Sequence, residues 1–330
     1  MLQLKNTTPF AADTAIFPNE QGVDSVYIIV KATFNIGVQW TLAEEQRSPN
    51  EKDIYWSDPD NSSIKFASDY HPCKMASDVI VLGSAYAPQG QALGELDVNV
   101  SVGQVSKKIR VYGDRVWQQG RISAPKPFKS MPMVYEKAFG GTYVVDHKTQ
   151  ASCMSNPLGC GFLGKRSISE MDGMPLPNLE DPEQLIRKHT DQPLPACMAF
   201  MGASWQPRSN YVGTYDEKWK TQRAPYLPED FDKRFFSMAH DDLVYPGFIQ
   251  GGEAVEITNM HISGDLIFNL PRIKLVSKIN ISGRVESPEF QLETLVIEPD
   301  QLLLSMVWKA QLECDKEVFK INDVGIHLSR

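Results

Sequence analysis

The sequence predicts a mainly β protein, with antiparallel, sandwich-like sheets at both ends of the chain and a long, loop-dominated region between them. Near both ends, apolar residues occupy every second position, which is the period of a half-buried strand. In the middle, 13 of the 22 prolines fall between Pro125 and Pro246. Because proline removes a backbone donor and interrupts helices and central strands, that region is expected to form ordered loops with a few short helices.

The first predicted element is a β-hairpin over residues 96–112. Apolar residues from Leu96 to Val102 recur at every second position, and residues 105–112 repeat the alternation after Gly103-Gln104. Successive side chains of a strand point to opposite faces, so each run has one apolar face. The glycine is therefore expected to lie in the turn between two paired strands.

The C-terminal part predicts a long strand over residues 273–284 and then a pair of strands over 292–297 and 302–312. The pair is separated by Glu298-Pro299-Asp300-Gln301, whose proline and aspartate are typical of a tight turn.

The central region predicts three short helices, at 181–186, 215–222 and 230–238. Asp181-Pro182-Glu183-Gln184 has the order of an N-cap, a first-turn proline and a capping-box residue. The region is also rich in aromatic residues, unlike a disordered linker. Gly140-Gly141 and Gly251-Gly252 are expected at positions that need positive φ or a close backbone approach.

These patterns divide the chain into an N-terminal β region (1–120), a loop-rich central region (121–245) and a C-terminal β region (246–330). The two β regions fit either one interleaved domain or separate domains.

Composition excludes several classes of protein. The 330 residues are 42% hydrophobic and carry a formal charge of −8, which does not suit the phosphate backbone of a nucleic acid. The apolar runs are far shorter than the roughly 18 residues of a membrane span. Five scattered cysteines and the lack of a signal-peptide pattern at Met1–Phe10 predict a cytoplasmic protein with reduced thiols.

The sequence predicts no cofactor, no metal site and no catalytic residue. His71-Pro72-Cys73 has two metal-ligand types but no second pair at zinc-module spacing. The alternative is a carbohydrate-active or other hydrolytic enzyme, in which Glu136 pairs with Asp216 or Asp230 as the two carboxylates. Asp114 and Arg115 lie between strand-like aromatic residues in the run 111–117, so at least one of them is expected to be half-buried, and a half-buried arginine needs a partner.

Motifs spread over most of the chain resemble a family of adaptors or chaperones of type VI secretion effectors, long catalogued as a domain of unknown function and encoded beside effectors with PAAR-like domains. The segments that carry the resemblance are Asn6–Phe10, Val30–Phe34, Asp78–Pro88, Val111–Trp117, Met131–Gly141, Asn156–Gly161, Leu176–Glu180, Trp205–Arg208, Gly213–Trp219, Pro228–Asp232 and Gly252-Glu253. The last 60 or so residues match less clearly.

The resemblance implies a cytoplasmic, non-enzymatic adaptor that binds and stabilises one cognate effector, through or near its PAAR-like region, and helps to load it onto the secretion spike. A structural component of the secretion machine is a further alternative. Protein-binding surfaces favour aromatic and arginine anchors, although most of the central aromatic residues are expected to fill the core. The residues predicted to bind the partner are Arg115, Trp117, Tyr135, Glu136, Phe139, Trp205, Arg208, Tyr215, Asp216 and Trp219.

Overall fold

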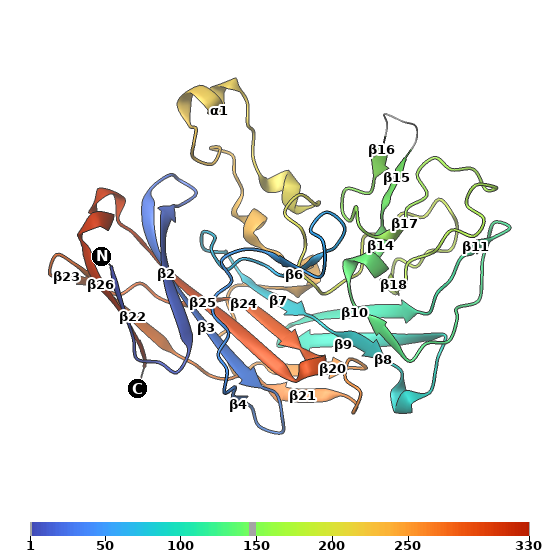
Figure 1. Cartoon of the computed structure of the whole chain (residues 1–330), viewed down its shortest axis with the longest axis horizontal. Coiled ribbons are helices and arrows are strands. Elements are labelled where there is room, and N and C mark those ends of the chain that lie inside the picture. The colour runs from blue at the N-terminus through green and yellow to red at the C-terminus, as the bar shows by residue number, and fades with distance from the viewer. Residues whose placement is uncertain (1, 145–149, 330) are drawn as a thin grey trace.

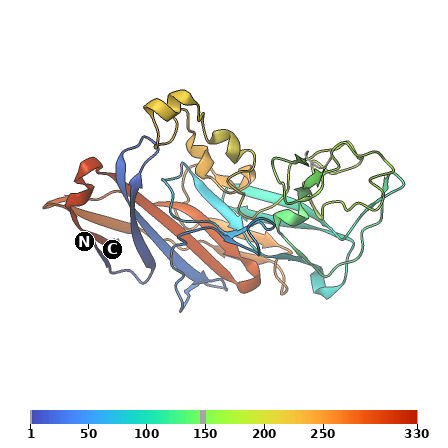
Figure 2. The same cartoon turned by 45° about the horizontal axis from the view of Figure 1, so that its top comes forward.

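The computed structural model describes residues 2–144 and 150–329. About 40% of the chain is strand and 10% helix, so the predicted mainly β fold is confirmed. Three larger sheets run along the length of the molecule, and the loops of the central region lie on one side of them (Figures 1 and 2).

The largest sheet combines strands from both ends of the chain. All its neighbours are antiparallel except β24 and β7, which are parallel. The strand order is β19 (Val244–Tyr245), β7 (Ser77–Val81), β24 (Gln291–Glu298), β25 (Leu303–Glu313), β3 (Asp24–Asn35) and β2 (Ala11–Pro18), with β4 (Thr41–Leu42) also beside β3. The predicted strand pair over 292–312 is confirmed as β24 and β25.

Strand β3 is buried from Ser25 to Phe34. A strand that is covered on both faces has no alternation of apolar and polar residues. The sequence of β3 therefore lacks the pattern that identifies a half-buried strand.

The second sheet contains the predicted hairpin over residues 96–112, which is confirmed with Gly103 in the turn at φ 55°. All its neighbours are antiparallel. The order is β18 (Leu179–Glu180), β10 (Val105–Tyr112), β9 (Glu95–Val102), β20 (Ala254–Thr258) and β21 (Leu266–Asn269).

The third sheet brings the two ends of the chain together (Figure 1). Its order is β1 (Gln3–Asn6), β26 (Ile321–Leu328), β22 (Leu275–Ile281) and β23 (Arg284–Glu286), with β1 parallel to β26. The predicted single strand over 273–284 is wrong only after Ile281, where β22 ends. Ser282 and Gly283 adopt positive φ and reverse the chain, so Arg284 lies on the returning strand.

The other strands form two-stranded ribbons. They pair as β5 (Ile54–Tyr55) with β6 (Ile64–Phe66), β8 (Ser84–Tyr86) with β13 (Ser130–Pro132), β11 (Trp117–Gln118) with β12 (Arg121–Ile122), β14 (Phe139–Gly140) with β17 (Cys160–Gly161), and β15 (Thr142–Val144) with β16 (Gln150–Ser152).

Of the three predicted helices, one is confirmed: α1 (Glu217–Gln222), capped by Asp216. Residues 181–184 form a single turn, because the Glu180 carboxylate accepts from the Ile186 amide and directs the chain away from a helix. The segment 230–238 holds one 3-10 turn, η4 (Lys233–Phe236). Further 3-10 turns are η1 (Pro88–Gly90), η2 (Tyr135–Lys137), η3 (Arg208–Tyr211), η5 (Asp241–Leu243), η6 (Pro299–Gln301) and η7 (Asp315–Lys320).

Both predicted glycine pairs have positive φ. Gly140 and Gly141 have φ of 150° and 114°, and a Cβ atom on Gly140 would lie 2.1 Å from the carbonyl oxygen of Asn156. Gly251 and Gly252 have φ of 93° and 89°.

One apolar core extends through the three sheets, and a small second core of Trp117, Phe139, Leu163, Met171, Leu176 and Ile186 lies under the central loops. The first and second sheets combine strands from before residue 120 and after residue 245. The division of the chain into domains stays a prediction. No helix in the described parts of the chain is long and apolar enough to cross a membrane.

Candidate functional site

Most of the predicted partner-binding residues are buried. Their side chains hold the central loops together and onto the sheets, as expected for most aromatic residues of this region. The six are Arg115, Trp117, Tyr135, Phe139, Trp205 and Arg208.

Arg115 has the charged partner that its sequence context predicts. Its guanidinium pairs with the Glu180 carboxylate, donates to the carbonyl oxygen of Pro177 at 2.8 Å and lies 3.6 Å from the centroid of the Tyr112 ring. Burial raises the pKa of Glu180 although the neighbouring arginine lowers it. Arg115 therefore fixes residues 177–180 against the second sheet.

Arg208 ties two central loops together. It donates to the carbonyl oxygens of Phe235 at 2.9 Å and Met201 at 2.5 Å, and burial lowers its pKa to about 10. Trp205, three residues earlier, packs edge-on against Tyr135 with 5.0 Å between ring centroids.

A buried ionic cluster, which no motif in the sequence indicates, supports this region from the largest sheet. Lys74 pairs with Asp78 at 2.5 Å, and Lys309 pairs with Glu293 at 3.0 Å. Lys309 also donates to the carbonyl oxygen of His71 at 2.8 Å. The signal that could have revealed the cluster is a lysine inside an apolar strand, as in Val307-Trp308-Lys309-Ala310.

Glu136 is half-buried, and its carboxylate is bonded to another segment of the chain. Its carboxylate accepts hydrogen bonds from the amide (2.6 Å) and the hydroxyl (2.8 Å) of Ser63. It thereby joins η2 to the loop before β6.

The remaining predicted residues, Tyr215, Asp216 and Trp219, lie together on a projection that we call the α1 arm, residues 213–230. Figure 1 shows the arm standing away from the sheets, with α1 near its tip. Tyr215 is 52% exposed, and its ring meets Trp219 edge-on with 4.6 Å between centroids. Trp219 is half-buried and Asp216 is exposed.

Hydrogen bonds inside the α1 arm give it a defined shape. The Asp216 carboxylate accepts from the Trp219 amide at 2.8 Å and caps α1, a contact that typically stabilises a helix by about 1 kcal/mol. The Trp219 indole donates to the carbonyl oxygen of Tyr226 at 2.8 Å. Asp230 accepts from the amide and hydroxyl of Thr214 and closes the base of the loop.

The α1 arm is anchored on the turn between β2 and β3. Arg223 of the arm donates to the carbonyl oxygen of Glu20 at 3.1 Å, and Lys233 of η4, just after the arm, pairs with the Glu20 carboxylate at 2.7 Å. The Tyr226 ring packs on Gly22, where a Cβ atom would lie 2.9 Å from the ring. These contacts hold a polar, exposed loop in a fixed position.

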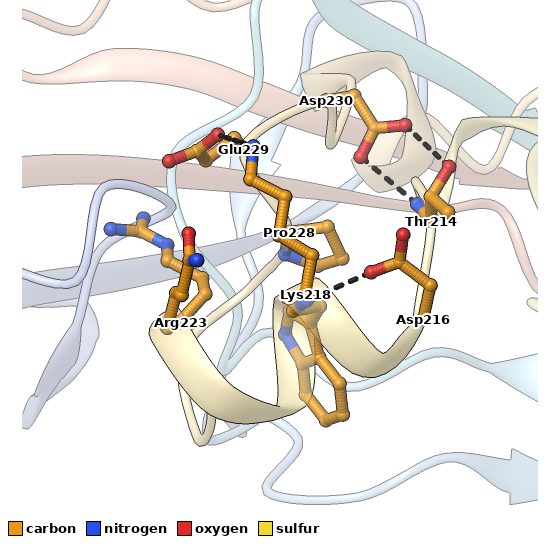
Figure 3. A pocket seen from close by; sticks show the side chains of 9 residues that line it. Thr214, Asp216, Lys218, Arg223, Pro228, Glu229 and Asp230 are labelled. Carbon is orange, nitrogen blue, oxygen red and sulfur yellow. Dashed lines mark hydrogen bonds and ion pairs between the residues drawn. The ribbon is translucent and has the colours of Figure 1, made fainter.

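A cleft of about 280 Å³ lies within the arm, between α1 and the segment 228–230 (Figure 3). Its walls carry both charge signs, including the ion pair of Lys218 with Glu229 at 3.4 Å. The lining residues are Thr214, Asp216, Lys218, Trp219, Gln222, Arg223, Pro228, Glu229 and Asp230.

Two of the three carboxylates of the hydrolase alternative, Asp216 and Asp230, line this cleft, whereas Glu136 does not. Hydrogen bonds from the Thr214 amide and hydroxyl lower the pKa of Asp230. A carboxylate pair that cleaves glycosides needs one acid with a raised pKa. The bonding of these carboxylates therefore favours a structural role.

His71 and Cys73 belong to no larger cluster of metal-ligand side chains among the described residues. Burial lowers the pKa of His71 and raises that of the Cys73 thiol, and the described residues contain no group of three or more His, Cys, Asp or Glu side chains that could hold a metal ion.

Comparison with known proteins gives one match. A family model described as an uncharacterized protein conserved in bacteria (DUF2169) matches residues 21–309. No curated protein and no solved structure matches the chain.

Proposed function

The chain belongs to this family of uncharacterized bacterial proteins, and from that premise we propose that it is a non-catalytic adaptor that holds another protein. The observation that carries the proposal is the α1 arm. It presents the exposed Tyr215, its half-buried neighbour Trp219 and charged side chains at a fixed position outside the core. Such residues on a rigid support are typical anchors of protein interfaces.

The proposed cargo is a cognate type VI secretion effector with a PAAR-like region, which the adaptor stabilises and helps to load onto the secretion spike. This part rests on the sequence resemblance of motifs such as Gly213–Trp219 and Pro228–Asp232, and both of these lie in or next to the α1 arm. The arm thus coincides with two of the motifs that suggest the function.

The proposed compartment is the cytoplasm. All five cysteines are free, which suits a reducing environment.

A pull-down with arm variants tests the proposal. The protein is expressed with the neighbouring effector, and capture is compared for wild type, Tyr215→Ala, Trp219→Ala and the control Phe319→Ala. Phe319 is 90% exposed on η7, outside the arm. Each arm variant should weaken binding by roughly 30-fold, about 2 kcal/mol for an interface anchor, whereas the control should bind like wild type.

Two results would contradict the proposal. One is undiminished capture and secretion of the effector by both arm variants. The other is hydrolysis of a polysaccharide that is abolished in Asp216→Asn and Asp230→Asn, which would favour the enzyme alternative instead.

A further inference from the structure

The outer edge of β21 is an open pairing edge next to an apolar cleft. β21 is the last strand of the second sheet, and among the strands of residues 2–144 and 150–329 it pairs with β20 alone. Figure 1 places it at the lower margin of the molecule, below β20 and far from the α1 arm.

The backbone bonding shows which groups point outward. Leu270 donates to the carbonyl oxygen of Glu253, and on the far side of β20 Gly103 donates to the carbonyl oxygen of Ala254. Because antiparallel pairing alternates along a strand, Phe268 and Leu266 bond toward β20. The amides and carbonyls of Ile267 and Asn269 are therefore directed to the open edge.

β21 lacks the features that normally protect a sheet edge, such as charge, proline or very short length. Its sequence is Leu-Ile-Phe-Asn, and Ile267 is 73% exposed. Of the other outer strands of the three larger sheets, β4 and β19 are two residues long. The others carry charge or proline: Lys5 on β1, Asp13 and Pro18 on β2, Glu180 on β18, and Arg284 and Glu286 on β23.

A cleft of about 360 Å³ lies against this edge. Ile36, Val38 and Leu302 form its apolar wall beside Leu266 and Ile267. Val38 is fully exposed in the loop between β3 and β4. An apolar side chain from a strand added beside β21 would have a place to bury.

Charges near the edge distinguish between possible occupants. Glu256 lies opposite Ile267 on β20, and Asp265 directly precedes β21. Both are exposed, and neither forms an ion pair with another residue that the structure describes. A second copy of this acidic chain would bring like charges together, whereas a segment with Lys or Arg at its ends would be attracted.

We propose that β21 accepts an extended, alternating apolar segment of the partner protein, flanked by basic residues, as an added strand. Main-chain bonds to Ile267 and Asn269 supply the pairing, and the cleft beside Val38 receives one side chain, as in other strand-addition complexes. The identity of this segment as part of the cargo rests on the proposed adaptor function. The edge itself can be tested without the cargo.

The test uses a nine-residue synthetic peptide with alternating valine and threonine between terminal lysines. Amide hydrogen exchange of the full chain is measured with and without the peptide. We expect at least 10-fold slower exchange of the Ile267 and Asn269 amides. A matched peptide with terminal glutamates should bind at least 10-fold more weakly.

Two variants locate the contact. Ile267→Pro removes an outward amide without removing a bond to β20, and Ile267→Lys places a charge on the edge. Each should weaken binding of the lysine peptide at least 10-fold, and Phe319→Lys, which replaces an exposed apolar residue elsewhere, should not.

The inference is overturned if the peptide fails to bind at millimolar concentration, or if it binds and leaves the exchange of both amides unchanged. A dimer of wild type that dissociates in Ile267→Lys would assign the edge to a second copy instead. If the peptide fails but capture of the effector still depends on Trp219, the proposed function stands and the edge inference falls. If the peptide binds and no effector is captured, the edge inference stands and the proposed function falls.

Discussion

Lys309 of β25 and Glu293 of β24 form a 3.0 Å ion pair in which both side chains are almost completely shielded from water. The lysine also bonds to His71, so the pair connects the largest sheet to the segment that precedes β7.

Removing one member of this pair should destabilise the protein strongly. Lys309→Met leaves the Glu293 carboxylate buried without its partner, and breaking a buried pair in this way costs about 3–5 kcal/mol. Urea unfolding measures the loss. Lys5→Met, which removes an exposed pair with Asp323, should cost less than about 1 kcal/mol, and equal losses in the two variants would refute the prediction.

Stability should fall in mildly acidic solution because of His71. Its ring is buried near Lys309, Lys74 and Arg208, and burial lowers its pKa in the folded state. Below the ordinary value of about 6.5, the unfolded chain therefore binds a proton that the folded chain does not. Above that pH, His71 should contribute no pH dependence to the free energy of unfolding. Below it, the free energy of unfolding should fall by up to about 1.4 kcal/mol per pH unit.

Urea titrations between pH 7.5 and 5.0 would detect this slope. His71→Gln should flatten it, with a remainder from His240, whose pKa burial also lowers. The exposed His189 provides a control, since His189→Gln should leave the slope as it is. An unchanged slope in His71→Gln would exclude His71 as its source.

The base of the α1 arm depends on a glycine. Gly213 has φ 77°, and a Cβ atom there would lie 2.8 Å from the Asp230 carboxylate and 2.9 Å from Pro228. Gly213→Ala should therefore open the arm and speed trypsin cleavage after Lys218, Lys220 and Arg223 several-fold.

The matched control is Gly247→Ala, because Gly247 also has positive φ, 83°, but a Cβ atom added there would meet no atom within 4 Å. In both variants, alanine at a positive φ costs about 1 kcal/mol. The two variants therefore differ only in the clash of the new Cβ atom at position 213. Equal cleavage rates in the two variants would show that the clash does not matter.

Asn156 holds a turn of the central region from within. Its side-chain amide donates to the carbonyl oxygens of Tyr135 at 2.7 Å and Phe139 at 3.1 Å. Asn156→Ala removes the donor to the buried Phe139 carbonyl, whereas the Tyr135 carbonyl still accepts from the Ala138 amide. The substitution should cost about 1–3 kcal/mol in thermal or urea unfolding. Asn35→Ala, at an exposed position, should lower the free energy of unfolding by less than about 0.5 kcal/mol, as is usual for surface substitutions.

Local patterns in the sequence predicted local structure well. The hairpin of β9 and β10 and the pair β24 and β25 follow from alternation across a short turn, and α1 lies within the helix predicted over 215–222. Long-range pairing could not be predicted in this way. The parallel contacts of β7 with β24 and β1 with β26 depend on packing between distant segments, and β3, buried on both faces, has no alternation that would identify it.

The candidate site was predictable only in part, for a related reason. Aromatic and arginine residues are favoured both in interfaces and in the core, so motif and residue type alone did not separate Trp117 and Arg208, which are buried, from Tyr215, which is exposed. The edge of β21 was not recognised either, because an open edge is defined by which strand is absent beside it.

The pairing of β3 with β25 has a consequence for the newly made chain. Thr33 pairs with Ser305, so β3 leaves the ribosome long before its neighbour has been synthesised. During that interval β2 can already pair with one edge of β3, but the edge that β25 will cover stays open, and apolar strands with an open edge aggregate readily in the cell. Production of this protein should therefore benefit from slow synthesis at low temperature more than its final stability alone would suggest.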